Sequence, residues 1–254
     1  MTTETARHAE TVGCAGLGML GAALAQRLAD AGHLNAVWNR TPGCAVGLDT
    51  AGVRRAAGPA ALMRESTVLV LCVSDSTAVE EVTFGPGGLA EGAGPGKVLV
   101  DHSSIGPQET RSLAARLAAE TGAHWLDAPV SGGPQGAAAG KLTVLAGGSA
   151  EDFDRVRPVL DAYAGRCTLT GPVGAGQATK LCNQIIVGAP PAGRWPRPRC
   201  WPPPPTSTPT GCPNTSKAGS PTRGCCTSSS RCSSPGTPAA SAPATTCSRT
   251  WTPR

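Results

Sequence analysis

The last 65 residues, 190–254, limit what this chain can fold into more than any other feature of its sequence. They hold 15 of the 24 prolines and six of the 11 cysteines, but no Asp, Glu, Ile, Leu, Val, Met, Phe or Tyr. Ordering one residue costs about 1–2 kcal/mol, and burying an aliphatic side chain returns about 1.5–3 kcal/mol. A segment without such side chains cannot build a hydrophobic core. We therefore expect residues 190–254 to be a disordered tail rich in Pro, Ser, Thr and Cys, and not a second globular domain.

The charge of the chain divides at the same point. Residues 1–189 carry all 17 acidic residues and 14 of the 22 basic ones, a net charge of −3, whereas residues 190–254 carry +8. The overall charge of +5 therefore belongs to the tail and gives no reason to expect a nucleic-acid partner. Because no run of about 18 apolar residues is present and the start of the chain is polar, we expect no membrane span, no signal peptide and a cytoplasmic location.

Five cysteines are spread through residues 1–189 without a CxxC pair. Isolated cysteines in a cytoplasmic chain act most often as small buried hydrophobic residues. We therefore predict no disulfide framework and no metal site, and the absence of His and CxxC from the tail argues against zinc there as well. The thiols expected to be buried are Cys14, Cys44, Cys72, Cys167 and Cys182.

Short apolar runs alternate with amphipathic segments along residues 11–170, a pattern typical of a parallel sheet with crossover helices. We predict strands at residues 11–15, 34–39, 67–73, 97–101, 124–127 and 142–145, and helices at 20–32, 108–120 and 150–160. The expected fold class is α/β, a Rossmann-type doubly wound and mainly parallel sheet over residues 1–170. Residues 174–189 form the start of an interdomain helix, which Pro190 and Pro191 end.

A glycine motif, Gly16-Leu17-Gly18-Met19-Leu20-Gly21, follows the first apolar run and opens the first predicted helix. In a GxGxxG turn the first Gly permits the bend, the second lets the backbone approach a pyrophosphate, and the third lets the helix pack on the strand. The helix N-terminus then offers its N–H groups to the phosphates. This placement favours a dinucleotide site over the alternative, a plain strand-to-helix turn.

The second predicted strand ends about 20 residues after the glycine motif, where the ribose of a dinucleotide is read. Its end is Trp38-Asn39-Arg40-Thr41. An acidic residue here would accept hydrogen bonds from both ribose hydroxyls of NAD, whereas Arg40 and Thr41 offer a guanidinium and a hydroxyl to a 2′-phosphate. We therefore expect NADP in preference to NAD. If Arg40 is only a solvated loop charge, the choice of cofactor stays open.

Two later motifs add groups that could carry chemistry. Lys180 and Asn183 lie three residues apart in the last predicted helix and so share one of its faces. A lysine whose pKa burial has lowered from about 10.4 can move the hydroxyl proton while hydride moves to or from carbon. Asn183 could hold the lysine or the substrate oxygen, and the turn Ser131-Gly132-Gly133 suits a substrate carboxylate. Alternatively, Lys180 is a solvated helical lysine.

The order of these motifs resembles one family. GLGMLG, WNRT, LCVSD at 71–75, DHSSIGP at 101–107, DAPVSGG at 127–133 and GAGQATKLCNQ at 174–184 closely resemble the β-hydroxyacid dehydrogenases, the group of 3-hydroxyisobutyrate dehydrogenase and tartronate semialdehyde reductase. The resemblance covers residues 11 to about 189. It implies a homodimeric oxidoreductase that interconverts a small 3-hydroxy acid and its semialdehyde. The substrate is thus a small carboxylate.

The resemblance also implies a role for each motif. Lys180 is the acid/base with Asn183 beside it, and Ser131, Gly132 and Gly133 bind the substrate carboxylate. The residues implied at the cofactor are Gly16, Leu17, Gly18, Met19, Gly21, Asn39, Arg40, Thr41, Val73, Ser103 and Ser104. Imine reductases share the fold and the WNRT signature, but their pattern does not place this lysine here. 6-Phosphogluconate dehydrogenases share a lysine helix but have a much larger second domain.

The tail departs from this family, whose members continue into an all-helical domain rich in Leu, Ala and Asp. A frameshift would explain the difference, because Cys and Trp codons begin with TG and become Leu, Val or Met codons when the frame slips by one base. The nine tail positions concerned are Trp195, Cys200, Trp201, Cys212, Cys225, Cys226, Cys232, Cys247 and Trp251. The alternatives are a genuine basic tail that binds acidic partners, and a catalytically inactive nucleotide-binding fragment with a disordered tail.

Overall fold

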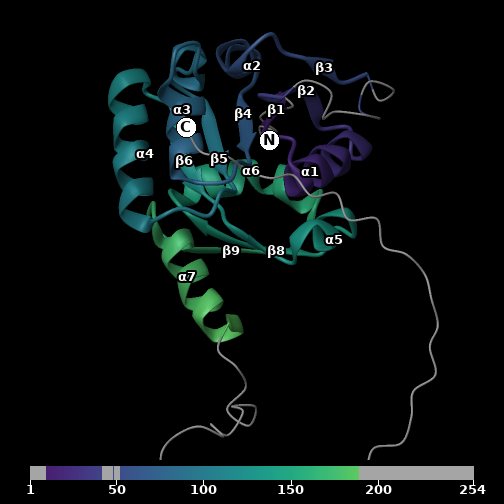
Figure 1. Cartoon of the computed structure of the whole chain (residues 1–254), viewed down its shortest axis with the longest axis vertical. Helices are drawn as coiled ribbons and strands as arrows, with labels where there is room; N and C mark the ends of the chain where they lie inside the picture. Colours follow the sequence, from purple (N-terminus) through teal and green to yellow (C-terminus); the bar gives the residue numbers. More distant parts are fainter. Residues whose placement is uncertain (1–9, 42–47, 49–51, 189–254) are drawn as a thin grey trace, which may run out of the picture. The chain divides into compact units, whose positions relative to one another are not determined.

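The computed structural model describes residues 10–41, 48 and 52–188 (Figure 1). The described residues form a nine-stranded sheet in the order β3-β2-β1-β4-β5-β6-β8-β7, with β9 paired to β8. The strands are β1 Val12–Ala15, β2 Leu34–Trp38, β3 Arg54–Arg55, β4 Val68–Leu71, β5 Val98–Asp101, β6 His124–Asp127, β7 Val130–Ser131, β8 Leu142–Gly147 and β9 Ala164–Gly171. The predictions for residues 190–254 and for Cys44 lie outside the described residues.

The helices of the described residues alternate with these strands. They are α1 Met19–Asp30, α2 Pro59–Glu65, α3 Ser76–Phe84, the short 3-10 helix η2 Leu89–Gly92, α4 Pro107–Thr121, α5 Gly133–Ala138, α6 Ala150–Asp161 and α7 Ala175–Gly188. Pairing is parallel from β3 through β6, while β8 runs antiparallel to both β6 and β7. The predicted doubly wound, mainly parallel α/β fold is therefore confirmed.

The direction of winding changes between β1 and β4. The chain runs outward from β1 to β2 and β3, then returns to place β4 on the other side of β1. In open α/β sheets a ligand crevice opens at the carboxyl ends of the strands on either side of such a switch point. The glycine motif follows β1 directly, so the topology places it at this crevice.

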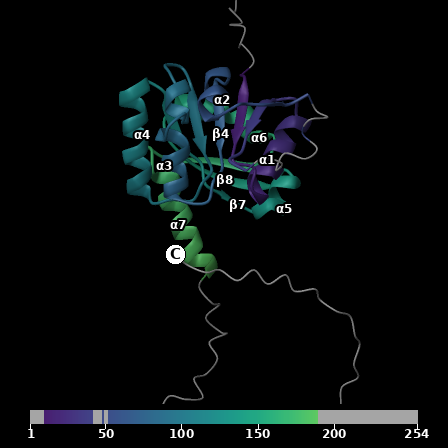
Figure 2. The same cartoon turned by 45° about the horizontal axis from the view of Figure 1, so that its top comes forward.

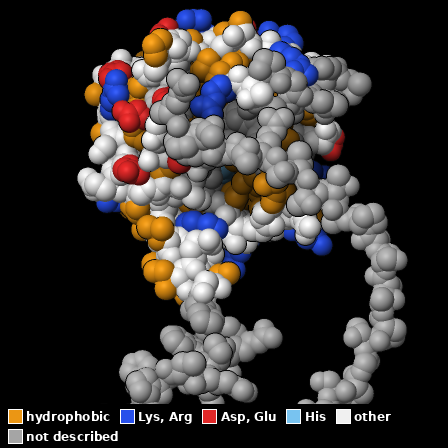
Figure 3. All heavy atoms as spheres, in the orientation of Figure 1, with side chains coloured by type: hydrophobic (Ala, Val, Ile, Leu, Met, Phe, Trp, Pro, Cys, Tyr) orange, Lys and Arg blue, Asp and Glu red, His pale blue; other side chains and the backbone are white. Residues whose placement is uncertain are grey.

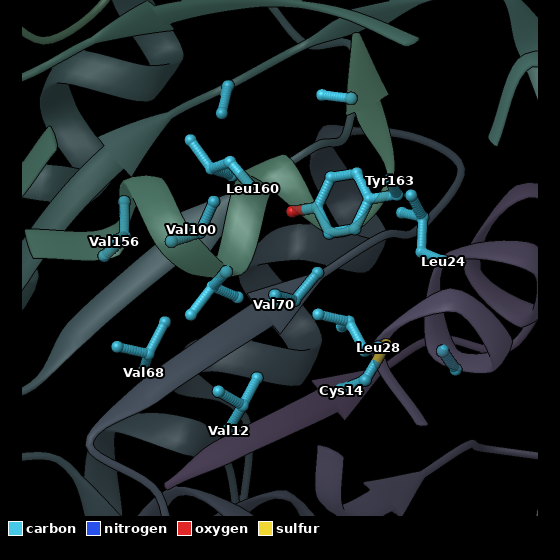
Figure 4. Packing of buried hydrophobic residues seen from close by; sticks show 14 of the residues in the cluster. Val12, Cys14, Leu24, Leu28, Val68, Val70, Val100, Val156, Leu160 and Tyr163 are labelled. Atoms are coloured by element: carbon cyan, nitrogen blue, oxygen red, sulfur yellow. The ribbon is translucent and has the colours of Figure 1, made fainter. Parts of the chain in front are cut away.

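Two hydrophobic clusters cover the two faces of the sheet. Strand β4 shows how one sequence serves both, because Val68 and Val70 belong to one cluster, and Leu69 and Leu71 to the other. Successive side chains of a strand point to opposite faces, and a strand buried on both faces is apolar throughout. Figure 4 shows the first cluster, in which α1 and α6 contribute side chains that pack around the fully buried Tyr163.

The last described helix, α7, is anchored only at its beginning. Gly176 and Gln177 in its first turn are buried, but most residues from Leu181 to Gly188 are exposed. The helix extends away from the sheet in two views (Figures 1 and 2). Figure 3 shows apolar side chains gathered on it. They include Ile185, Ile186 and Val187, which are 72–74% exposed. No helix among the described residues is long and apolar enough to cross a membrane.

The structure corrects several expectations for individual segments. Helix α3 was not predicted, because four of its nine residues are β-branched and therefore poor helix formers. Its capping residue Asp75, which accepts a hydrogen bond from the Ala78 N–H at 2.9 Å, was the overlooked signal. Strand β9 was also missed. The prediction of buried thiols is confirmed for Cys14 but wrong for Cys182, which lies on the exposed part of α7, while Cys72 and Cys167 are only half-buried.

Candidate functional site

The three glycines of the motif carry out different tasks in the loop between β1 and α1. Gly16 has φ +88°, a conformation that other residues rarely adopt, and a Cβ there would overlap the Cys72 carbonyl. A Cβ at Gly21 would overlap the Gly16 carbonyl oxygen, so helix and loop meet without room for a side chain. A Cβ at Gly18, in contrast, would meet no atom within 4 Å. Gly18 therefore faces open space, where a ligand's phosphates can approach the backbone.

Helix α1 directs its N-terminus at the same space. The helix begins at Met19 without a side-chain cap, and its first turn contains no acidic residue. The first N–H groups of a helix lack partners within the helix and carry a partial positive charge. The loop and the helix end together form a cradle for an anionic group, which fits the pyrophosphate of a dinucleotide.

Asn39 and Arg40, which follow β2, make different contacts. The side-chain oxygen of Asn39 accepts a hydrogen bond from the Leu17 N–H at 2.8 Å, and its amide N–H donates to the Thr41 carbonyl at 2.9 Å. Asn39 therefore braces the glycine loop. The Arg40 side chain is 77% exposed, and its guanidinium pairs with the exposed Glu81 carboxylate at 3.7 Å. An exposed ion pair of this kind is weak, so a ligand phosphate can replace the carboxylate.

A pocket of about 580 Å³ lies between these elements. It includes all of the sequence-predicted cofactor residues except Leu17, whose side chain is buried in the core. The predicted residues that line it are Gly16, Gly18, Met19, Gly21, Asn39, Arg40, Thr41, Val73, Ser103 and Ser104. Sequence reasoning missed Trp38, Cys72, Val82, His102 and Pro134, which also line it and contribute mostly apolar surface.

The ends of β4 and β5 are tied together at this pocket. The Ser103 hydroxyl accepts a hydrogen bond from the Val73 N–H at 3.1 Å, and the Ser103 N–H donates to the Asp101 carboxylate at 2.9 Å. His102 is buried beside them, with Nε2 2.7 Å from the Tyr163 hydroxyl and Nδ1 against the Ala128 carbonyl. Burial lowers the pKa of His102 to about 4, so the ring is neutral.

Lys180 lines a second pocket, of about 400 Å³, beside the first. Desolvation by partial burial lowers the pKa of its amine. Ser104 lines both pockets, so the lysine pocket adjoins the far end of the cofactor pocket. Asn183 is half-buried on the same helix and lines neither of these two pockets.

The predicted carboxylate-binding turn lies at the junction of β7 and α5. Gly132 and Gly133 both have positive φ, +123° and +61°, and both are exposed. Ser131 to Gly133 line neither pocket, although the next residue, Pro134, lines the cofactor pocket. The structure thus brings the turn to the edge of the cofactor pocket and does not place it in contact with Lys180.

Two acidic residues lie side by side at the ends of neighbouring strands, Asp101 of β5 and Asp127 of β6. Burial, with the Asp127 charge adding to it, raises the pKa of Asp101 to about 7. Burial also raises the pKa of Asp127, although this carboxylate accepts hydrogen bonds from the Gly174 and Gln177 N–H groups at 2.7 and 2.9 Å. Sequence reasoning quoted Asp127 within a motif but gave it no role.

Comparison with known proteins places the chain in a family. The protein family described as the NAD binding domain of 6-phosphogluconate dehydrogenase matches residues 11–171 of the sequence. The chain is 40% identical over 176 residues to the 2-hydroxy-3-oxopropionate reductase of Escherichia coli, an alignment that covers 69% of this chain and 60% of that protein. The chain thus spans about three-fifths of the length of this curated relative.

Solved structures show the same partial coverage. A structure of Mycobacterium tuberculosis 3-hydroxyisobutyrate dehydrogenase with L-serine superposes with a TM-score of 0.66 at 32% identity, over 71% of this chain and 60% of that one. An imine reductase from a Pseudomonas species superposes equally well, with a TM-score of 0.66 over 71% of this chain and 62% of that one. Its identity is only 22%, so this second likeness shows the fold alone. With its motifs, its fold and these relatives, the chain belongs to the β-hydroxyacid dehydrogenase family, and residues 11–171 are its NAD-binding domain.

Proposed function

We propose that the chain derives from an NADP-preferring oxidoreductase that interconverts a small 3-hydroxy acid and its semialdehyde, with Lys180 as the acid/base. The observation that carries the proposal is the shared position of Ser104. It lines both the pocket of the glycine loop and the pocket of Lys180. One end of a dinucleotide held by the glycine loop would therefore lie next to the amine.

The roles of the residues follow from this arrangement. A bound nicotinamide cofactor supplies or accepts the hydride. In reduction, Lys180 donates a proton to the aldehyde oxygen as hydride reaches the carbon, and in oxidation it removes the hydroxyl proton as hydride leaves. Partial burial lowers the pKa of the amine, which makes the loss of its proton easier. We assign the substrate carboxylate to Ser131, Gly132 and Gly133, and the neighbourhood of the reacting oxygen to Asn183.

The preference for NADP depends on Arg40 and Thr41. Both line the cofactor pocket at the end of β2, and neither is acidic. A guanidinium binds a phosphate through charge-assisted hydrogen bonds, which the ribose hydroxyls of NAD cannot match. The exposed position of Arg40 leaves it able to make them.

A turnover assay tests the proposed function. NADPH consumption is followed with a panel of small semialdehydes, using the 254-residue chain, a frame-corrected version of it, and Lys180→Ala in each. Turnover that is lost in Lys180→Ala is the expected result. Full activity of Lys180→Ala would overturn the proposed mechanism. Sequencing the gene across codons 187–195 tests the frameshift, and early stops in the alternative frame would exclude it.

The exposed end of α7 favours a second candidate, a nucleotide-binding protein without catalysis. Among the described residues nothing covers Ile185, Ile186 or Val187, and an exposed apolar patch of this kind marks an interaction surface or an unstable protein. This candidate predicts NADPH binding without turnover for the 254-residue chain, and turnover for the frame-corrected version. A homodimer and a cytoplasmic location stay predictions.

A further inference from the structure

The side chain of Gln177 joins α7 to the loop that follows β5. Its amide N–H donates a hydrogen bond to the Ser103 carbonyl at 2.7 Å, and its oxygen accepts one from the Ile105 N–H at 3.3 Å. Gln177 is 1% exposed. The N–H and the oxygen of this buried amide thus both bond to the backbone of the segment that contains Ser104.

Asp127, at the end of β6, also binds this turn of α7. The carboxylate accepts the Gly174 and Gln177 N–H groups, which are orphan donors at the helix N-terminus. A negative charge at this end of a helix is favourable, and charge-assisted hydrogen bonds offset the cost of burying it. A Cβ at Gly176 would lie 2.8 Å from Asp127 Oδ2, so the helix approaches β6 as closely as a glycine allows.

Beyond this turn the described structure gives α7 little support. Residues 181–188 are exposed apart from the half-buried Asn183. Lys180 lies three residues after Gln177, on the same face of the helix, and both line one pocket with Ser104. The direction in which Lys180 enters the pocket is therefore set by the contacts of the first turn.

We propose that Gln177 is a positioning residue, which holds Lys180 at a fixed place relative to the Ser103–Ile105 loop at the cofactor pocket. The Gln177 amide joins the loop to α7 at a point one helical turn before Lys180. Because both ends of the amide are engaged by backbone groups, it acts on the reaction through Lys180 and Ser104. This inference rests on the proposed function of Lys180.

The test measures the environment of Lys180 without requiring turnover. The full chain is labelled with the amine-reactive ester N-hydroxysuccinimidyl acetate over a pH series, and the midpoint of the Lys180 labelling profile is read by peptide mass spectrometry. The exposed Lys141 in the same digest serves as the reference for labelling efficiency. The main variant is Gln177→Met, which keeps the length and neutrality of the side chain but loses both hydrogen bonds. The matched control is Gln26→Ala, which removes an exposed glutamine that donates to Asp30 at 2.8 Å on α1.

The expected result is a rise of the Lys180 midpoint in Gln177→Met, by about half a pH unit or more toward the ordinary lysine value of about 10.4, because a loosened helix exposes the amine to water. The charged residues that line the pocket, Asp75 and Glu109, are unchanged in every variant. Gln26→Ala should leave the midpoint where it is in the parent chain. An unchanged midpoint in Gln177→Met, or an equal rise in Gln26→Ala, would overturn the proposal.

A second variant keeps the test decisive if Gln177→Met does not fold, as judged by circular dichroism. Gln177→Ala leaves space in which water can satisfy the Ser103 carbonyl and the Ile105 N–H, and the same rise is expected of it. The result is also separable from the turnover assay. If NADPH consumption proves independent of Lys180, the proposed function fails, while the labelling midpoint still reports whether Gln177 positions the lysine.

Discussion

The side-chain oxygen of Asn39 lies 2.8 Å from the backbone nitrogen of Leu17 and accepts its N–H. This bond joins the end of β2 to the middle of the glycine loop, 22 residues earlier in the chain. Asn39 lines the cofactor pocket, but its oxygen is engaged with the protein backbone. The residue that sequence reasoning placed at the ribose therefore also controls the shape of the loop that would hold the phosphates.

Asn39→Ala should weaken NADPH binding about fivefold. The variant loses the hydrogen bonds to the Leu17 N–H and to the Thr41 carbonyl, and only the first falls on the loop that holds the ligand, at a cost of about 1 kcal/mol. A titration of nicotinamide fluorescence measures the change. The control is Asn35→Ala, because the Asn35 oxygen accepts the Val12 N–H at the same 2.8 Å, at the other end of β1. Asn35→Ala should lower stability and leave NADPH affinity unchanged; equal losses of affinity in both variants would contradict this account.

The second and third glycines of the motif should respond differently to the same substitution. Gly18 has φ −68° and open space at its Cβ position, so Gly18→Ala should keep the melting temperature and lower NADPH affinity tenfold or more. In Gly21→Ala the new methyl group would overlap the Gly16 carbonyl, at a cost of about 1–3 kcal/mol in stability. Thermal denaturation by circular dichroism and the NADPH titration separate the two. If Gly18→Ala binds NADPH normally, the glycine loop and the N-terminus of α1 do not hold the phosphates of the cofactor.

The choice between NADP and NAD should depend on Arg40. Arg40→Ala removes the proposed partner of the 2′-phosphate, so NADPH affinity should fall about tenfold while NADH affinity stays within twofold. The measurement is a pair of fluorescence titrations with the two cofactors. Glu81→Gln is the companion variant, because the Glu81 carboxylate lies 3.7 Å from the Arg40 guanidinium and competes with a phosphate for it. It should raise NADPH affinity and not NADH affinity. Equal losses for both cofactors in Arg40→Ala would show that Arg40 does not read the phosphate.

Sequence reasoning predicted those parts of the fold and site that depend on local pattern. Strand β4 could be recognised because all four of its residues are apolar, as in a strand buried on both faces, and the glycine motif because its spacing is itself the signal. The contact between Gln177 and Ser103 spans 74 residues and exists only because β5 and β6 are neighbours in the sheet. No local pattern distinguishes Gln177 from the exposed Gln184 on the same helix. The role of Gln177 therefore became visible only in the folded structure.

Burial of Asp101 should make stability depend on pH in a defined direction. Its pKa is raised to about 7, against about 3.9 in an unfolded chain, so between these values the folded chain binds a proton that the unfolded chain has lost. The free energy of unfolding contributed by Asp101 therefore falls as pH rises through this window, by up to about 1.4 kcal/mol per pH unit, and is constant above it.

His102 produces the opposite slope over part of the same range. Its pKa is lowered to about 4, against about 6.5 when unfolded, so its contribution to stability is present above pH 6.5 and is lost as pH falls through the folded value. The two contributions oppose each other in the parent chain, so only a variant isolates the contribution of Asp101.

Asp101→Asn keeps an oxygen for the Ser103 N–H and cannot titrate. Its stability relative to the parent should therefore increase from pH 4.5 to 7 and level off above that, as measured by urea denaturation at each pH. Asp30→Asn, which changes an exposed carboxylate on α1, should show no such trend, and a difference between Asp101→Asn and the parent that does not vary with pH would mean that Asp101 is ionised throughout.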